Sequence, residues 1–240
     1  MTADQHINTA SLVNFRNIAG SLSLYRTAHV HVYRKEDIEF LKEKKITCVV
    51  DFRNSEEIQK QDLFELVKSD HEMKYINFPI AGYQGAFRDI HSPSTQDYVH
   101  YALRIMTHGA QAFKKFLNLL EVSENERFVF GCHAGKDRTG IMSILIHNIL
   151  GVSNEVTYQD FMTTNEELQN HAHHFENNWT KRKMSKEEYL QRIRLEETYF
   201  DALMLEINRR YGSLELYISN TLNISNDSRA IIAKKYTHHD

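Results

Sequence analysis

The fold is decided by the stretch FVFGCHAGKDRTG, which occupies residues 128–140. Arg127 to Phe130 predicts a short apolar strand. A loop from Gly131 to Gly140 follows, and Ile141 to Leu150 is apolar on most sides, which predicts a helix inside the protein. Because ligands of open α/β sheets bind beyond the carboxyl ends of the strands, we expect a binding site at this loop.

The loop has the features of an anion site. A helix N-terminus offers free backbone N–H groups and the positive end of a dipole, and a tight loop in front of it forms a nest of amides. Glycines let the backbone turn closely around a ligand. The expected substrate-binding positions in the loop are His133, Ala134, Gly135, Lys136 and Thr139.

Two side chains of the loop predict the reaction. The Cys132 thiol, at the positive end of the helix and beside Arg138, is expected to be a thiolate near neutral pH. A thiolate can attack phosphorus and form a covalent intermediate. Arg138 offers two parallel donors to phosphate oxygens, which lysine cannot. Thr139 can donate its hydroxyl to the thiolate and help it leave in the second step. Cys132 and Arg138 are therefore the predicted catalytic pair of a phosphomonoesterase.

The loop resembles the signature of the protein tyrosine phosphatase superfamily, which is Cys, five residues, Arg and Thr-Gly. It is more closely similar to a bacterial and fungal tyrosine phosphatase family whose loop reads CxAGKDRTG. The resemblance covers nearly the whole chain. Other segments that resemble this family are NFRN at 14–17, LYRTA at 24–28, VDFRN at 50–54, LGV at 150–152, DFMTTN at 160–165 and RYGS at 210–213.

The resemblance implies a protein tyrosine phosphatase-like fold and a phosphorylated protein or phosphoinositide as substrate. Members act on phosphotyrosine, and some also act on phosphoserine, phosphothreonine and phosphoinositides. The Asp-Arg-Thr sequence also follows the cysteine in myotubularin-like lipid phosphatases. The chain departs from the superfamily at Gly131, where a histidine that orders the loop and favours the thiolate usually stands.

The general acid that protonates the leaving group is the open question. The segment that usually supplies it follows Phe78-Pro79, but residues 80–87 contain no acid. Asp137, nearest the phosphate in sequence, is the first candidate, and its alternative role is to brace the loop. Asp51, also a predicted substrate-binding position, is the second, and its alternative role is an ion pair with a neighbouring arginine. Asp89 is expected to be a solvated loop residue.

Outside the loop, strands alternate with helices. This pattern predicts an α/β fold with a central, largely parallel sheet flanked by helices and with a helical C-terminal part. We expect a single domain over residues 1–240, in which 166–194 forms either a lid or a surface excursion. The expected strands are Ile46–Phe52 and Lys74–Phe78, and the expected helices are Arg34–Lys44, Thr95–Leu120 with a break at Gly109, Asn154–Asn165, Leu195–Tyr211, Leu214–Leu222 and Asp227–Tyr236.

Composition limits the other functions. A net charge of −3 argues against nucleic acid as a partner. The first ten residues lack a signal-peptide core and the run 141–150 is too short to span a bilayer, so we expect a cytoplasmic protein, with export that needs no cleavable signal left open. His171, His173 and His174 lack partner ligands, so no metal or cofactor is predicted.

Two other functions compete with the phosphatase. A pseudophosphatase would bind phosphorylated partners without turnover, although Cys132 and Arg138 are both present. A thiol redox enzyme would need a resolving cysteine, and Cys48 is the only one in the sequence. The alternative role of Cys48 is a small apolar side chain in the core.

Overall fold

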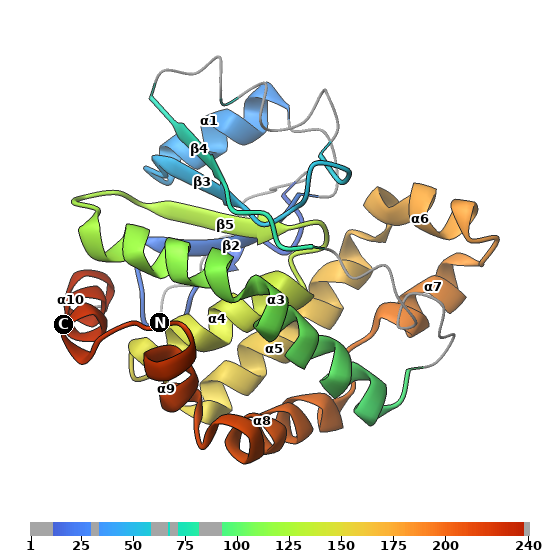
Figure 1. The fold of residues 1–240 in the computed structure, drawn as a ribbon. Coiled ribbons are helices and arrows are strands. Elements are labelled where there is room, and N and C mark those ends of the chain that lie inside the picture. The colour runs from blue at the N-terminus through green and yellow to red at the C-terminus, as the bar shows by residue number, and fades with distance from the viewer. Residues whose placement is uncertain (1–11, 30–33, 59–66, 68–71, 82–92, 238–240) are drawn as a thin grey trace, which may run out of the picture.

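The computed structural model describes residues 12–29, 34–58, 67, 72–81 and 93–237. Within these residues, five strands form one sheet in the order β1-β2-β5-β3-β4 (Figure 1). Only the pairing of β1 with β2 is antiparallel. The predicted α/β class with a largely parallel sheet is confirmed. The strands are β1 Arg16–Asn17, β2 Leu24–Ala28, β3 Cys48–Asp51, β4 Lys74–Asn77 and β5 Phe128–Cys132.

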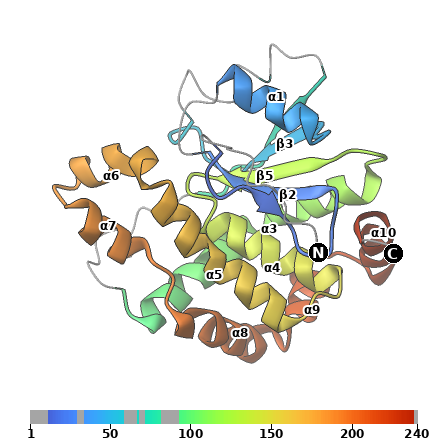
Figure 2. The same ribbon diagram turned by 180° about the vertical axis from the view of Figure 1, so that it is seen from behind.

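Helices cover both faces of the sheet. Figure 1 places α1 on one face and α3 and α4 on the other, and the view from behind shows α5 beside α4 and α8 farther from the sheet (Figure 2). The helices are α1 Lys35–Glu43, α3 Thr95–Val122, α4 Asp137–Ile149, α5 Asn154–Asn170, η2 Ala172–Phe175, α6 Glu176–Lys181, α7 Lys186–Ile193, α8 Glu197–Tyr211, α9 Leu214–Leu216, the π-turn η3 Tyr217–Thr221, and α10 Asn226–Tyr236.

The central strand β5 gives its side chains alternately to the two faces. Phe128, Phe130 and Cys132 belong to the large core that α3 and α4 build, whereas Val129 packs in the smaller core under α1 with Leu41. All five residues of β5 are buried. The strand therefore delivers Cys132 to the α3 and α4 side, at the carboxyl edge of the sheet.

Two helices hold this edge in place. In α4, apolar side chains surround the whole helix and nearly all of them are buried, as expected of a helix inside a protein. The start of α3 is fixed by Ser94, whose hydroxyl accepts from the Asp97 N–H while the Asp97 carboxylate accepts from the Ser94 N–H. Helices α3 and α4 pack on each other as well as on the sheet.

Several expectations need correction. Helix α3 runs unbroken for 28 residues, so Gly109 does not interrupt it. The glycine instead allows close packing, since a Cβ there would lie 3.0 Å from the Phe113 ring. The active loop is shorter than 131–140, since β5 reaches Cys132 and α4 starts at Asp137. Strands β1 and β2 were not predicted. The segment 214–222 is split between α9 and η3, and α5 continues to residue 170.

Most of the acid-free segment 80–87, together with residues 88–92, lies outside the described residues. None of the helices that the structure describes is long and apolar enough to cross a bilayer.

Candidate active site

The predicted nucleophile lies at the end of β5, directly before the first turn of α4. Cys132 is only 2% exposed, and the Thr139 hydroxyl donates to its sulfur over 3.1 Å. This is the contact expected of a hydroxyl that stabilises a thiolate. The N-terminus of α4 contributes the positive end of its dipole at the same place.

The backbone of the loop is shaped from outside. Asn14 Nδ2 donates to the carbonyls of Ala134 and Gly135, over 3.2 and 2.9 Å, and Arg26 Nη2 donates to the Gly135 carbonyl over 2.7 Å. Because the N–H of a trans peptide points away from its C=O, the amides of Gly135 and Lys136 are turned to the opposite side. This orientation is the one an anion nest requires.

Gly135 must be glycine for two reasons. Its φ is +61°, a backbone conformation that residues with a side chain rarely adopt. A Cβ there would also lie 2.5 Å from the carbonyl oxygen of Thr27. Strand β2 therefore packs directly against the loop.

A buried charge network supports Asn14 and Arg26. Asp160 of α5 accepts from Arg16 Nε over 2.6 Å and from Arg26 Nη1 over 2.5 Å, and Arg16 also bonds the Asn14 side chain. Burial alone would raise the pKa of Asp160, but the charges of Arg26 and Arg16 outweigh it and lower the pKa to about 2. Three segments that resemble the phosphatase family in sequence thus meet behind the loop.

Arg138 is held by a residue that sequence reasoning missed. Its Nη1 and Nη2 donate to the two carboxylate oxygens of Glu57, each over 2.6 Å. Burial alone would raise the pKa of Glu57, but the hydrogen bonds and charge of Arg138 outweigh it and lower the pKa. Glu57 closes a turn in which the Asn54 side chain accepts from the Glu57 N–H. The signal available in sequence was this Asn-x-x-Glu turn after the strand that ends at Asp51.

Asp51, the second candidate acid and a predicted substrate-binding position, is bound by other side chains of the protein. Its side chain is fully buried and binds Arg53 through two oxygens, with Tyr75 donating over 2.8 Å. Burial alone would raise the pKa of Asp51, but the charges of His29 and Arg53 and the hydrogen bonds from Arg53 keep it below its usual value. The ion pair considered from sequence is therefore the role that fits Asp51, and Asp89 lies outside the described residues.

Asp137 remains the candidate acid. Its Oδ1 atom is buried and has no hydrogen-bond partner among the described residues, while Lys136 Nζ lies 3.4 Å from it. The side chain as a whole is 19% exposed. It is thus the first residue of α4, one position before Arg138, with an oxygen that is close to the Lys136 ammonium but accepts no hydrogen bond from the described residues.

The segment 166–194 packs on the loop. The Asn178 amide of α6 lies 3.1 Å from His133 Nε2, and Lys136 Nζ donates over 2.9 Å to the carbonyl of Ile193 in α7. Phe175 contacts the His133 ring and is fully buried. Two predicted substrate-binding side chains are therefore engaged by this segment, which Figure 2 shows as the α6 and α7 arm at one side of the molecule.

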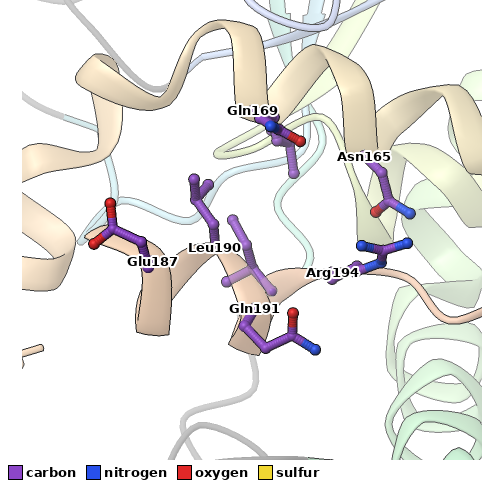
Figure 3. A pocket seen from close by; sticks show the side chains of 8 residues that line it. Asn165, Gln169, Glu187, Leu190, Gln191 and Arg194 are labelled. Carbon is purple, nitrogen blue, oxygen red and sulfur yellow. The ribbon is translucent and has the colours of Figure 1, made fainter. Parts of the chain in front are cut away.

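A cavity of about 180 Å³ lies between α5 and α7. In Figure 3, side chains from the two helices converge on it. It does not contain Cys132, but Ile193, whose carbonyl accepts from Lys136, belongs to its lining. The lining residues are Asn165, Leu168, Gln169, Glu187, Leu190, Gln191, Ile193 and Arg194.

Cys48 cannot act as a redox partner of Cys132. In the sheet Cys48 pairs with Phe128, which lies four positions before Cys132. At the usual rise per residue of a strand, the Cα atoms of Cys48 and Cys132 are therefore offset by roughly 13 Å along the strand direction. A disulfide needs Cα atoms within about 7 Å. Burial raises the pKa of the Cys48 thiol to about 12, which fits an apolar core role.

His171, His173 and His174 do not form a metal site. Although the rings of His173 and His174 lie 4.0 Å apart, no group of three His, Cys, Asp or Glu side chains in the described ranges could hold a metal ion.

Comparison with known proteins gives a family match over most of the chain. A model described as the tyrosine phosphatase family matches residues 7–238. No curated protein sequence matches significantly.

Two solved structures are similar in part. The core catalytic domain of the PP-IP phosphatase Siw14 from S. cerevisiae, in complex with citrate, is 18% identical with a TM-score of 0.43, over 63% of this chain and 75% of that one. TpbA from P. aeruginosa is 13% identical with a TM-score of 0.34, over 81% of this chain and 91% of that one.

Proposed function

The chain belongs to the tyrosine phosphatase family, and from this premise we propose that it hydrolyses phosphotyrosine in proteins through a phosphocysteine intermediate. The observation that carries the proposal is the arrangement of Cys132, Thr139 and Arg138 around one turn of loop. A phosphoinositide is the second substrate class, because some members of the family that the loop resembles act on phosphoinositides, and because Asp-Arg-Thr also follows the cysteine in myotubularin-like lipid phosphatases. We expect the enzyme to work in the cytoplasm, where a reactive thiol stays reduced.

In the first step the Cys132 thiolate attacks phosphorus, an S–P bond forms and the P–O bond to the substrate breaks. The electron pair of that bond leaves on the substrate oxygen, which takes a proton from Asp137. Arg138 and the loop amides bind the remaining phosphate oxygens, on which negative charge is concentrated. The fork that Glu57 makes with Arg138 fixes the plane of the guanidinium before the substrate arrives.

In the second step water attacks the phosphocysteine. The Asp137 carboxylate accepts a proton from that water, and the S–P bond breaks with its electron pair on sulfur. The hydroxyl of Thr139, 3.1 Å from Sγ, stabilises the departing thiolate. Inorganic phosphate is released and both groups return to their starting protonation states.

The substrate class is tested with a panel of a phosphotyrosine peptide, a phosphoserine peptide and phosphoinositide vesicles, each with the wild-type protein and Cys132→Ser. We expect turnover of the phosphotyrosine peptide by the wild type in the presence of a chelator, and none by Cys132→Ser, because a serine hydroxyl is hardly ionised at neutral pH.

Each other outcome of the panel has a definite meaning. Phosphate binding without turnover by the wild type would make the protein a pseudophosphatase, and turnover of vesicles alone would move the substrate to phosphoinositides. Activity lost in chelator and restored by a divalent ion would point to a metallophosphatase.

A further inference from the structure

Gly131, directly before the nucleophile, has its side-chain space filled by another residue. A Cβ at this position would lie 2.8 Å from Nε2 and 3.0 Å from Cδ2 of His29, and 2.6 Å from the carbonyl oxygen of Thr27. His29 follows β2, the strand beside β5, and is completely buried. The imidazole ring therefore lies against the Cα of Gly131, one residue from Cys132.

We propose that His29 is a positioning residue for Cys132. It supplies, from the end of the neighbouring strand, the imidazole that loops of the protein tyrosine phosphatase superfamily usually carry at the position of Gly131. The proposal rests on the proposed phosphocysteine chemistry. The two positions are coupled, since a side chain at 131 and the His29 ring exclude each other. Glycine at 131 is thus what the His29 ring and the Thr27 carbonyl together require, and the imidazole at this place comes from residue 29.

The backbone of His29 is fixed to the nucleophile. Its N–H donates to the Cys132 carbonyl over 2.8 Å, which extends the pairing of β2 with β5 by one hydrogen bond beyond the strand. Its own carbonyl accepts from Arg53 Nη1 over 2.7 Å. Because Arg53 is held in turn by Asp51, His29 connects β3 to the end of β5. The backbone that carries the ring is therefore fixed relative to residue 132.

The surroundings of the ring are charged. Among the described residues, Asp51 at the end of β3 and Arg53 two residues beyond it are charged groups at this corner, and the backbone of Cys132 accepts from the His29 N–H. Besides burial, the charge of His29 is one of the influences on the pKa of Asp51. An imidazolium here adds positive charge behind the loop, which favours both the thiolate and a bound phosphate.

The test is the pH dependence of Cys132 alkylation by iodoacetamide, followed by mass spectrometry of the peptide, in wild type, His29→Gln and His29→Asn. Glutamine and asparagine keep a polar side chain but cannot carry the charge. We expect the pH at half-maximal alkylation to rise by about one unit, and kcat/KM for p-nitrophenyl phosphate near pH 6 to fall about tenfold. Cys48 does not interfere, because burial raises its pKa to about 12.

His147→Gln is the matched control. His147 is also a buried histidine, 1% exposed in α4, and burial lowers its pKa to about 4. Its loss is expected to reduce stability without moving the alkylation midpoint. Vanadate binding shows whether each variant keeps the folded loop.

The inference is overturned if a folded His29 variant has the wild-type midpoint and the wild-type kcat/KM. A wild-type protein that is inactive and whose Cys132 is not alkylated would instead overturn the proposed function. The two failures are therefore distinguishable.

Discussion

Among single residues, Asp137 is the one that we predict protonates the leaving group. Asp137 has a buried oxygen that accepts no hydrogen bond from the described residues, and it directly precedes Arg138, whereas Asp51 is bound by Arg53. We predict that Asp137→Asn slows an aryl phosphate with a poor leaving group far more than one whose leaving group has a low pKa. A good leaving group needs little protonation in the transition state, so kcat/KM for the two substrates should separate.

Asp201→Asn, a change on the exposed side of α8, serves as the control and should leave both rates unchanged. Equal slowing of both substrates by Asp137→Asn would show that Asp137 only braces the loop. The proton would then have to come from water or from a residue that the structure does not describe.

At the scale of elements, α5 stabilises the loop from behind through Asp160. The pKa of this carboxyl is about 2 in the folded protein, compared with 3.8 as its ordinary value. A depressed pKa contributes stability that is fully present above pH 3.8 and is lost as the pH falls toward 2. We predict that between about pH 5 and pH 2 the free energy of unfolding falls on the order of 2 kcal/mol more in wild type than in Asp160→Asn.

Urea unfolding at a series of pH values measures this difference, with Asp201→Asn again as the control. Parallel curves for wild type and Asp160→Asn would contradict the assignment of a buried carboxylate to this network. Loss of Asp160 should also lower kcat, because Arg26 would no longer hold the Gly135 carbonyl firmly.

The elements with a clear local pattern were predictable, including strands β3 and β4 and most of the helices, whereas strands β1 and β2 were not. Strand β5, the loop and α4 are one continuous local pattern, so the sequence indicates all three. Strand β1 has only two residues, too few for any periodicity. Strand β2 is buried at every position, and its five residues contain an arginine and a threonine that hide the apolar pattern. Both depend on pairing with distant parts of the chain.

The same distance limit applies to the site. Cys132, Arg138 and Thr139 lie within one loop, and sequence spacing alone brought them together. Glu57 is 81 residues from Arg138, and Asn14 is 121 residues from Gly135, so their roles depend on the order of strands in the sheet. The single domain, the lid role of 166–194 and the general acid stay predictions.

For the whole molecule, the sheet brings three distant segments to one edge. The carboxyl ends of β2, β5 and β3 meet there, and they carry His29, Cys132 and the Asp51–Arg53 pair. Helix α4 adds its N-terminus, and the α6 and α7 arm packs on the loop from the other side. The architecture thus concentrates positive charge and backbone donors around one thiol, which is the central claim of this account.

The most direct test of that claim is to trap the intermediate. Wild-type protein is mixed with a phosphotyrosine peptide, quenched rapidly and digested, and the peptide that contains Cys132 is analysed by mass spectrometry. The account predicts phosphate on Cys132 that appears before free phosphate, decays with turnover and is absent from Cys132→Ser. Product formation with phosphate on a different residue, or with no phosphoenzyme and undiminished turnover by Cys132→Ser, would contradict it.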